Sequence, residues 1–343
     1  MIIASFTYAK PSGLRTVHDQ IVHRLRCRGY TIVSHYGDVS MPGIDVHGFR
    51  HIEAKNIVGF TTWHLGNLST AALAISPLPF LWIPFVEGIP IVTDLAREAI
   101  NSKHVIVAPT NYVKTMLEKV GIRVRKVVPP YIDVRLAVPD PILVRMVRSY
   151  FRDCRAVLSY VAAYYPRKAI DRVLEAVDRA AELYGTELGF ILLTNRAPSY
   201  RPKNVRLWLD TSLGSAGDAT IASYIAASDV YIHLSFSEGL GIPMIIAQYL
   251  GKPLVIPNAE PFTEVCRGVC ITVDIEKVTY EEWIGEELVE NKVWSLDHAA
   301  QRIIEAIELA PTVDKDEVRR RAQIKYMNIV NIDVIDRILK EMK

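Results

Sequence analysis

Short apolar runs rich in β-branched residues alternate with helix-like stretches along most of this chain, and this alternation restricts the possible folds more than any other feature. In the first half the apolar runs are IIASFTY (2–8), YTIVSHY (30–36), NIVGFTT (56–62), IPIVT (89–93), HVIVAP (104–109) and VRKVVPP (124–130). Between the first two runs, the stretch 14–29 is typical of a helix that ends at Gly29. Apolar runs bounded by helices predict βα units and a parallel sheet.

The alternation pauses at Pro129 and Pro130, pauses again at 138–141, and then starts a second series. The apolar runs of this series are VLSYVAA (157–163), LGFILLTN (188–195), VRLWLD (205–210), VYIHLS (230–235), PLVIPN (253–258) and VCITVDI (269–275). A chain of 343 residues also exceeds one ordinary core. We therefore predict an α/β protein of two doubly wound, Rossmann-like domains that face a central cleft, with helical segments over 279–343.

Composition excludes several classes of protein. Half of the residues are hydrophobic and 23% are charged, which is typical of a folded soluble enzyme. Residues 1–133 carry 14 Lys/Arg and 9 Asp/Glu, a positive excess too small to indicate nucleic-acid binding. No signal peptide opens the chain, so we expect a cytoplasmic location, and four cysteines are too few for a disulfide scaffold. We expect Cys266 and Cys270 to be buried or incidental thiols rather than a redox or metal pair.

The run Leu68–Val86 has no charge over 19 residues. It is nearly long enough to span a bilayer, but Pro77, Pro79 and Pro84 would break a spanning helix. We expect a core helix followed by a buried loop. The alternative is a surface that touches a membrane or a lipid acceptor, which would give the N-terminal domain a peripheral membrane contact.

The string AASDVYIHLSFSEGLGIPMIIAQYLGKPLVIPNAEPFTEV (226–265) resembles the C-terminal domain of retaining glycosyltransferases with the GT-B fold. That large family includes sucrose and glycogen synthases. Its members have the same order of features: a similar strand, an E-G-x-G-x-P loop, a helix and a G-x-P-x-V stretch. Three further segments are similar in a looser but collinear way: PSGLRTVHDQIVHRLRCRGY (11–30), VVPPYID (127–133) and LSYVAAYYPRKAIDRVLEAV (158–177).

This resemblance implies an organisation and an activity. It implies an acceptor-side domain over 1–133, a nucleotide-sugar-binding domain over 134–327, and a final helix over 328–343 that packs back on the first domain. The implied activity is metal-independent transfer of a hexose, with retention of configuration, to a glycan, lipid or protein acceptor. The implied co-substrate is a UDP- or GDP-sugar, with no other cofactor and no metal.

A diphosphate leaving group requires charge compensation, which backbone amides at a helix N-terminus can supply. The predicted donor-binding residues next to such a helix start are Glu238, Gly239, Leu240, Gly241 and Ile242. Lys168, at another predicted helix start, is a suitable cation, and Arg167 beside it is a second candidate. Gly13, with Ser12, can close over the phosphates from the other domain, or it can form an ordinary βα turn.

Glu238 is the central candidate, with Lys168, for catalysis. A carboxylate accepts hydrogen bonds from sugar hydroxyls and stabilises positive charge that develops on the ring in an oxocarbenium-like transition state. The resemblance assigns Glu238 to the hydroxyls of the donor sugar. The alternative is a structural carboxylate that caps the helix starting near Gly241.

Several positions depart from the family pattern, which has two glutamates separated by seven residues. The second glutamate usually binds the ribose of the nucleotide, and here that position is Ile246. The usual Arg in the G-R-L stretch corresponds to Ala163. The N-domain His of the family has no clear equivalent, although Asp94 lies near that place and His64 is an acceptor-side candidate at the end of another strand.

Three interpretations stay open. The first is an active glycosyltransferase, and the second is a degenerate relative that binds nucleotide or glycan without turnover. The third is an epimerase or a phosphorylase with the GT-B fold. An acid at position 246 could accept two ribose hydroxyl bonds, so Ile246→Glu would either tighten nucleotide-sugar binding or, if Ile246 belongs to the core, destabilise the domain.

Overall fold

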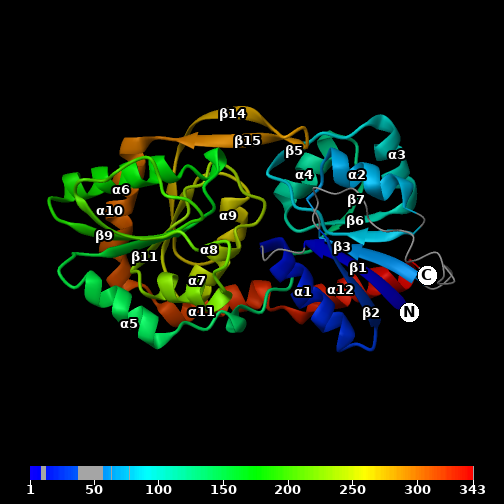
Figure 1. The fold of residues 1–343 in the computed structure, drawn as a ribbon, viewed down its shortest axis with the longest axis horizontal. Helices are drawn as coiled ribbons and strands as arrows, with labels where there is room; N and C mark the ends of the chain where they lie inside the picture. Colours follow the sequence, from blue (N-terminus) through cyan, green and yellow to red (C-terminus); the bar gives the residue numbers. More distant parts are fainter. Residues whose placement is uncertain (9–12, 38–56, 63, 77, 343) are drawn as a thin grey trace. The chain divides into compact units, whose positions relative to one another are not determined.

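The computed structural model describes residues 1–8, 13–37, 57–62, 64–76 and 78–342, and its chain forms two compact units. Unit 1 comprises Met1–Asp133, Tyr280–Glu290 and Tyr326–Lys343, and unit 2 comprises Val134–Thr279 and Asn291–Lys325. Each unit contains a six-stranded sheet flanked by helices (Figure 1). The predicted fold class, two Rossmann-like α/β domains, is therefore confirmed.

The sheet of unit 1 has the order β2-β1-β3-β4-β6-β7, and all of its pairings are parallel. Its strands are β1 (Ile2–Tyr8), β2 (Thr31–Gly37), β3 (Ile57–Thr61), β4 (Phe80–Trp82), β6 (Val105–Ala108) and β7 (Val124–Val127). The helices of this unit are α1 (Gly13–Arg26), α2 (Asn67–Ile75), α3 (Asp94–Lys103), α4 (Asn111–Lys119) and α12 (Ile329–Glu341). Helix α12 is tied to the start of the unit by ion pairs from Arg28 to Asp333 and Asp336.

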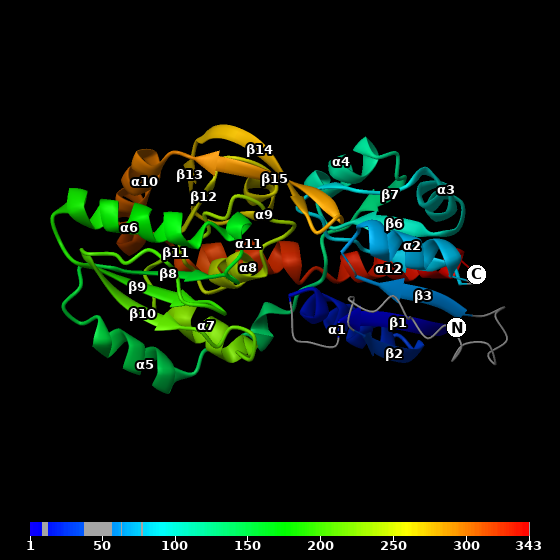
Figure 2. The same ribbon diagram turned by 45° about the horizontal axis from the view of Figure 1, so that its top comes forward.

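The sheet of unit 2 has the order β10-β9-β8-β11-β12-β13 and is also parallel. Its strands are β8 (Val157–Val161), β9 (Leu188–Leu193), β10 (Val205–Asp210), β11 (Val230–Ile232), β12 (Leu254–Pro257) and β13 (Cys270–Val273). The helices are α5 (Pro141–Tyr150), α6 (Ile170–Tyr184), α7 (Asp218–Ala226), α8 (Ile242–Tyr249), α9 (Phe262–Val265), α10 (Leu296–Leu309) and α11 (Lys315–Tyr326). Figure 2 shows α6 and α10 on one side of this sheet and α5 and α7 on the other. Every residue of β8 and β9 is buried, as expected for parallel strands covered on both faces.

The region 279–343, expected to be helical, is mostly helical from α10 onward, but it begins with a β-hairpin that was not expected. Its strands are β14 (Ile275–Trp283) and β15 (Glu287–Trp294), and residues Ile284 and Gly285 at the turn both have positive φ. Positive φ at both central residues is the geometry of a tight two-residue hairpin turn. The periodicity of the sequence did not reveal this hairpin, because β14 is exposed along most of its length and has no buried face.

The assignment of strands around the uncharged run was also wrong in part. Run 89–93 was expected to be a strand of the parallel sheet, but β5 (Gly88–Pro90) pairs with β15 in antiparallel fashion. Strand β4 takes its place in the sheet and lies within Leu68–Val86, where a buried loop was expected. A buried strand of three residues has no periodicity to distinguish it from a loop. None of the helices in the described residues is long and apolar enough to cross a membrane.

The expectation for the cysteines was wrong for one pair. Cys266, directly after α9, forms a disulfide with Cys270, the first residue of β13. Their Cα atoms are 6.5 Å apart, within the range that a disulfide requires. The spacing of four residues excluded a zinc motif, but it could not show that the chain turns back between α9 and β13.

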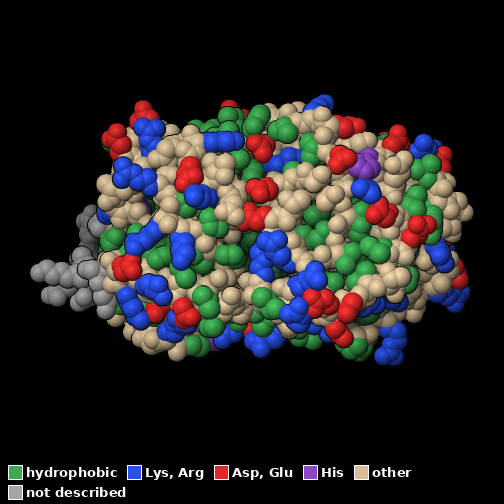
Figure 3. All heavy atoms as spheres, turned by 180° about the vertical axis from the view of Figure 1, so that it is seen from behind, with side chains coloured by type: hydrophobic (Ala, Val, Ile, Leu, Met, Phe, Trp, Pro, Cys, Tyr) green, Lys and Arg blue, Asp and Glu red, His purple; other side chains and the backbone are tan. Residues whose placement is uncertain are grey.

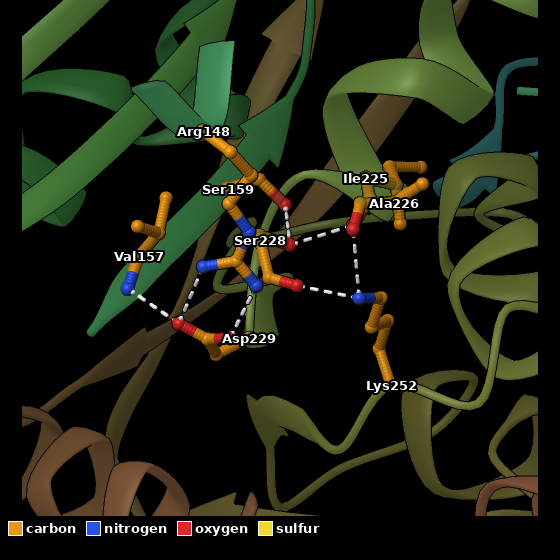
Figure 4. A network of polar contacts seen from close by, with 8 residues as sticks. All are labelled: Arg148, Val157, Ser159, Ile225, Ala226, Ser228, Asp229 and Lys252. Atoms are coloured by element: carbon orange, nitrogen blue, oxygen red, sulfur yellow. Dashed lines mark hydrogen bonds and ion pairs between the residues drawn. The ribbon is translucent and has the colours of Figure 1, made fainter. Parts of the chain in front are cut away.

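A buried lysine and a partly exposed ion pair lie at the C-terminal end of α7 in unit 2 (Figure 4). The Lys252 ammonium is 8% exposed and donates to the carbonyls of Ala226, at 2.9 Å, and Ser228, at 2.5 Å. Arg148 donates two hydrogen bonds to Asp229 next to them, at 3.1 and 2.5 Å. Burial lowers the pKa of Lys252 to about 8, and the positive charge of Arg148 contributes in the same direction.

We expect this lysine to make the protein more stable at alkaline pH. Its pKa of about 8 in the folded state lies below its ordinary value of 10.5, so the unfolded chain binds more protons between these values. The free energy of unfolding should therefore gain about 2 kcal/mol from Lys252 between pH 7.5 and 9.5. Urea unfolding of the wild type and of Lys252→Met at the two pH values checks this gain. Equal pH dependence in the two proteins would contradict it.

Candidate active site

Unit 2 has a topological switch point between β8 and β11. From β8 the chain adds β9 and β10 on one side, and from β11 it adds β12 and β13 on the other. Open α/β sheets bind ligands outside the carboxyl ends of their strands at such a point. Two loops leave the sheet there, residues 162–169 after β8 and residues 233–241 after β11.

Hydrogen bonds hold these two loops together. The amide of Phe236 donates to the carbonyl of Arg167 at 2.8 Å. The buried hydroxyl of Tyr160 donates to the carbonyl of Lys168 at 2.8 Å and lies 2.7 Å from Ser235 Oγ. The backbone of the short 3-10 helix Pro166–Lys168 is therefore fixed against the segment that leads to Glu238.

Lys168 and Glu238 meet at this switch point. Lys168 Nζ donates to Glu238 Oε2 at 2.9 Å and to the carbonyl of Ser237 at 3.3 Å. His233 Nε2 lies 3.4 Å from the same Oε2. Burial alone would raise the pKa of Glu238, but the Lys168 and His233 side chains outweigh it and hold the pKa well below its usual range. Glu238 is therefore a carboxylate at neutral pH, and 16% of its side chain remains exposed.

The N-terminus of helix α8 follows directly. Gly241 is its N-cap, with φ of 75°, a conformation that residues with a Cβ rarely adopt. A Cβ at Gly241 would also lie 3.1 Å from His233 Nε2. The first amides of a helix have no partner within the helix and carry its positive dipole end, so they favour an anion. A cation, a carboxylate and an anion-binding helix end thus lie on neighbouring loops.

The other predicted donor-binding residues have the following places. Gly239 and Leu240 are buried in the loop before Gly241, and Ile242 is the first residue of α8. The Arg167 guanidinium lies over the Tyr165 ring, 4.9 Å from its centroid. The structure therefore brings Arg167, Lys168 and the Glu238–Ile242 segment to one edge of one sheet.

Gly13, His64 and Asp94 belong to unit 1. Gly13 opens α1 after β1, whereas Ser12 lies outside the described residues. His64 follows β3, the sheet neighbour of β1, and its Nε2 lies 3.5 Å from Glu287 Oε2, which is nearly fully buried. Asp94 is the first residue of α3, is largely exposed and forms an ion pair with Arg97 at 2.9 Å. The positive end of the helix dipole favours a carboxylate in the first turn of α3, so the presence of Asp94 is explained without a role in binding.

Two residues at the departures from the family pattern lie beside the cluster. Ile246 is on α8 and is only 4% exposed, so it packs in the interior. Ala163 is in the loop after β8, where its carbonyl accepts the amide of Tyr165 at 2.9 Å. In this loop, Arg167 and Lys168 supply the positive charge.

Sequence reasoning missed His233. It directly follows β11 and is 2% exposed. The signal was a single histidine inside the apolar run VYIHLS, five residues before Glu238. A histidine in such a run is most simply a core residue, and only the tertiary structure shows that its ring lies 3.4 Å from the Glu238 carboxylate.

Comparison with known proteins identifies related sequences and folds. Residues 155–279 match the sequence model of the family described as Glycosyl transferases group 1, and no curated protein matches the chain in sequence. HepE of Anabaena, solved in complex with UDP and glucose, has a TM-score of 0.69 at 14% identity, covering 99% of this chain and 100% of that one. Sucrose-phosphate synthase of Thermosynechococcus elongatus has a TM-score of 0.70 at 12% identity, covering 100% and 99%. A glycosyltransferase of Rickettsia africae has a TM-score of 0.65 at 13% identity, covering 99% and 98%.

At these identities the structural likeness shows the fold alone. The family match is independent of it and contains Lys168, His233 and Glu238. The match and the two-unit α/β architecture together support a glycosyltransferase with the GT-B fold.

Proposed function

We propose that the protein transfers a hexose from a nucleotide-sugar donor to an acceptor hydroxyl with retention of configuration. The observation that carries this proposal is the Lys168–Glu238 pair at the N-terminus of α8, at the switch point of the unit 2 sheet. This arrangement offers positive charge to a diphosphate and negative charge to a sugar ring within a few ångströms.

In the proposed reaction, the bond between the sugar C1 and the donor phosphate oxygen breaks first, within an ion-pair-like transition state. The amides of Leu240, Gly241 and Ile242 at the start of α8 and the Lys168 ammonium stabilise the departing diphosphate. Glu238 binds donor hydroxyls and stabilises the positive charge that develops on the ring. The acceptor oxygen bonds to C1 on the face that the diphosphate leaves, and its proton passes to a phosphate oxygen. Because helix end and ammonium neutralise the leaving group, we infer that no metal is needed.

UDP-sugars are the first donors to test, since the HepE structures contain UDP or UDP-glucose. GDP-sugars are the second choice. Ile246 does not distinguish the two, because UDP and GDP carry the same ribose and the acid that would bind it is missing for both. We assign the acceptor, a glycan, lipid or protein hydroxyl, to unit 1, with His64 after the carboxyl end of strand β3. We infer a cytoplasmic protein, with peripheral membrane contact through this unit if the acceptor is a lipid.

Ile246 and Ala163 favour a second candidate, a relative that binds a nucleotide sugar without turnover. Losing a charge-assisted bond to ribose costs ~1.5–3 kcal/mol of binding but removes no group that reacts.

On the face drawn in Figure 3, acidic and basic side chains are interspersed, and we propose no nucleic-acid partner.

A binding screen followed by a turnover assay tests the proposal. Thermal unfolding is measured with UDP-, GDP- and ADP-sugars, and release of nucleotide from each stabilising donor is then followed without acceptor, with and without EDTA. We expect stabilisation and slow, EDTA-insensitive hydrolysis of at least one donor. Stabilisation without hydrolysis or transfer would favour the second candidate, and no stabilisation by any donor would contradict both.

A further inference from the structure

His233 is a buried polar side chain whose hydrogen bonds are not completed by the part of the chain that the structure describes. Its side chain is 2% exposed, and neither ring nitrogen has a hydrogen-bond partner of good geometry among the described residues. Leaving a buried donor or acceptor unsatisfied is unfavourable, because the group loses its hydrogen bonds to water and gains none in the protein. A histidine kept in this state by a well-packed core points to a role in the site next to it.

The ring is held on its sides by aromatic residues. The centroids of Tyr231, Phe262 and Tyr160 lie 5.9, 5.8 and 6.1 Å from that of His233. The edge that carries Nε2 is directed at the loop, where Glu238 Oε2 lies 3.4 Å away and Gly241 provides the space. The ring therefore cannot turn away from Glu238 without disturbing the core.

Both contacts of the carboxylate use the same oxygen. Lys168 Nζ and His233 Nε2 are both directed at Oε2, and within the described part of the chain Oε1 has no hydrogen-bond partner. Since 16% of the side chain stays exposed, a ligand can reach Glu238, and Oε1 is the oxygen that the protein contacts leave for it. Two groups that hold one oxygen determine where the other oxygen points.

We propose that His233 is a positioning residue, which together with Lys168 holds Glu238 Oε2 so that Oε1 faces the hydroxyls of the donor sugar. The ring acts in the tautomer that carries a proton on Nε2, which donates to Oε2. When a donor sugar pulls Glu238 into place, the 3.4 Å contact closes into a hydrogen bond and the buried nitrogen gains a partner. This inference rests on the proposed function and adds a residue that determines its geometry.

Three variants at one position separate positioning from packing. His233→Phe keeps an aromatic ring and removes both nitrogens. His233→Gln places an amide nitrogen near Nε2, whereas His233→Asn reaches only the position of Nδ1. Tyr231→Phe is the matched control, because it removes one polar atom from the neighbouring ring and leaves the contacts of Glu238 unchanged. The measurements are kcat, the affinity for free UDP by calorimetry, and the melting temperature.

We expect His233→Phe and His233→Asn to lower kcat by about ten- to hundredfold while the affinity for UDP stays within about twofold, since a small misplacement of a reacting group has effects of this size. His233→Gln should recover most of the rate, and Tyr231→Phe should keep it. Wild-type rates in His233→Phe would overturn the inference while leaving the proposed function intact. Equal losses of rate, UDP affinity and melting temperature in all three His233 variants would overturn it too, as they would show a packing role. A wild type without turnover on any donor would sink the proposed function, and the inference with it.

Discussion

Replacing Glu238 by alanine should lower sugar transfer by about a hundredfold or more while the protein remains folded. The carboxylate is held ionised by Lys168 and His233, so it meets the developing positive charge of the sugar ring without reorganisation. The measurement is kcat at saturating donor, with circular dichroism to verify folding. Glu238→Gln should lose nearly as much rate, because its amide can still accept a bond from Lys168 but carries no charge.

The matched control is Glu305→Gln, which removes an exposed carboxylate on α10 that pairs with Arg302. It should keep the wild-type rate and stability, since exposed pairs contribute little. If Glu238→Ala transferred sugar at the full rate with the donor bound, Glu238 would have no role in the transition state, and its interpretation as a structural carboxylate beside α8 would remain.

Replacing Ile246 by glutamate should destabilise the protein by about 3 to 5 kcal/mol, because it buries a carboxylate without a partner. The sequence left two outcomes open, tighter binding of a nucleotide sugar or loss of stability. The structure favours the second, since Ile246 is only 4% exposed. Burial raises the pKa of an unpaired carboxyl, so the deficit should be present at pH 8 and shrink as the pH falls toward 5, where the group is protonated.

Urea unfolding at the two pH values measures this deficit, and Ile246→Leu is the control. That substitution conserves volume and should cost less than about 1.5 kcal/mol. A folded Ile246→Glu variant that bound a nucleotide sugar more tightly than the wild type by calorimetry would contradict the prediction. It would mean that α8 lines a ribose site and that the missing acid limits donor binding.

The sequence by itself predicted a doubly wound parallel sheet in each half of the chain and the segments that form the candidate site. Buried parallel strands consist of nearly continuous apolar runs, and helices between them leave few alternatives to a doubly wound sheet. Glu238 and the glycines after it could be recognised because strand, loop and helix start are adjacent along the chain. Lys168 was recognised in the same way at another helix start.

Only the tertiary structure decided which of these residues meet. Lys168 and Glu238 are 70 residues apart, and they form a pair because β8 and β11 are neighbours in the sheet, an order that no local pattern contains. His233 joins them because the loop after β11 brings Glu238 back to 3.4 Å from its ring. His64 meets Glu287 through a hairpin whose exposed strand lacks an apolar face. Local sequence reports the conformation of a segment, whereas strand order and the return of distant segments depend on the burial free energy of the whole chain.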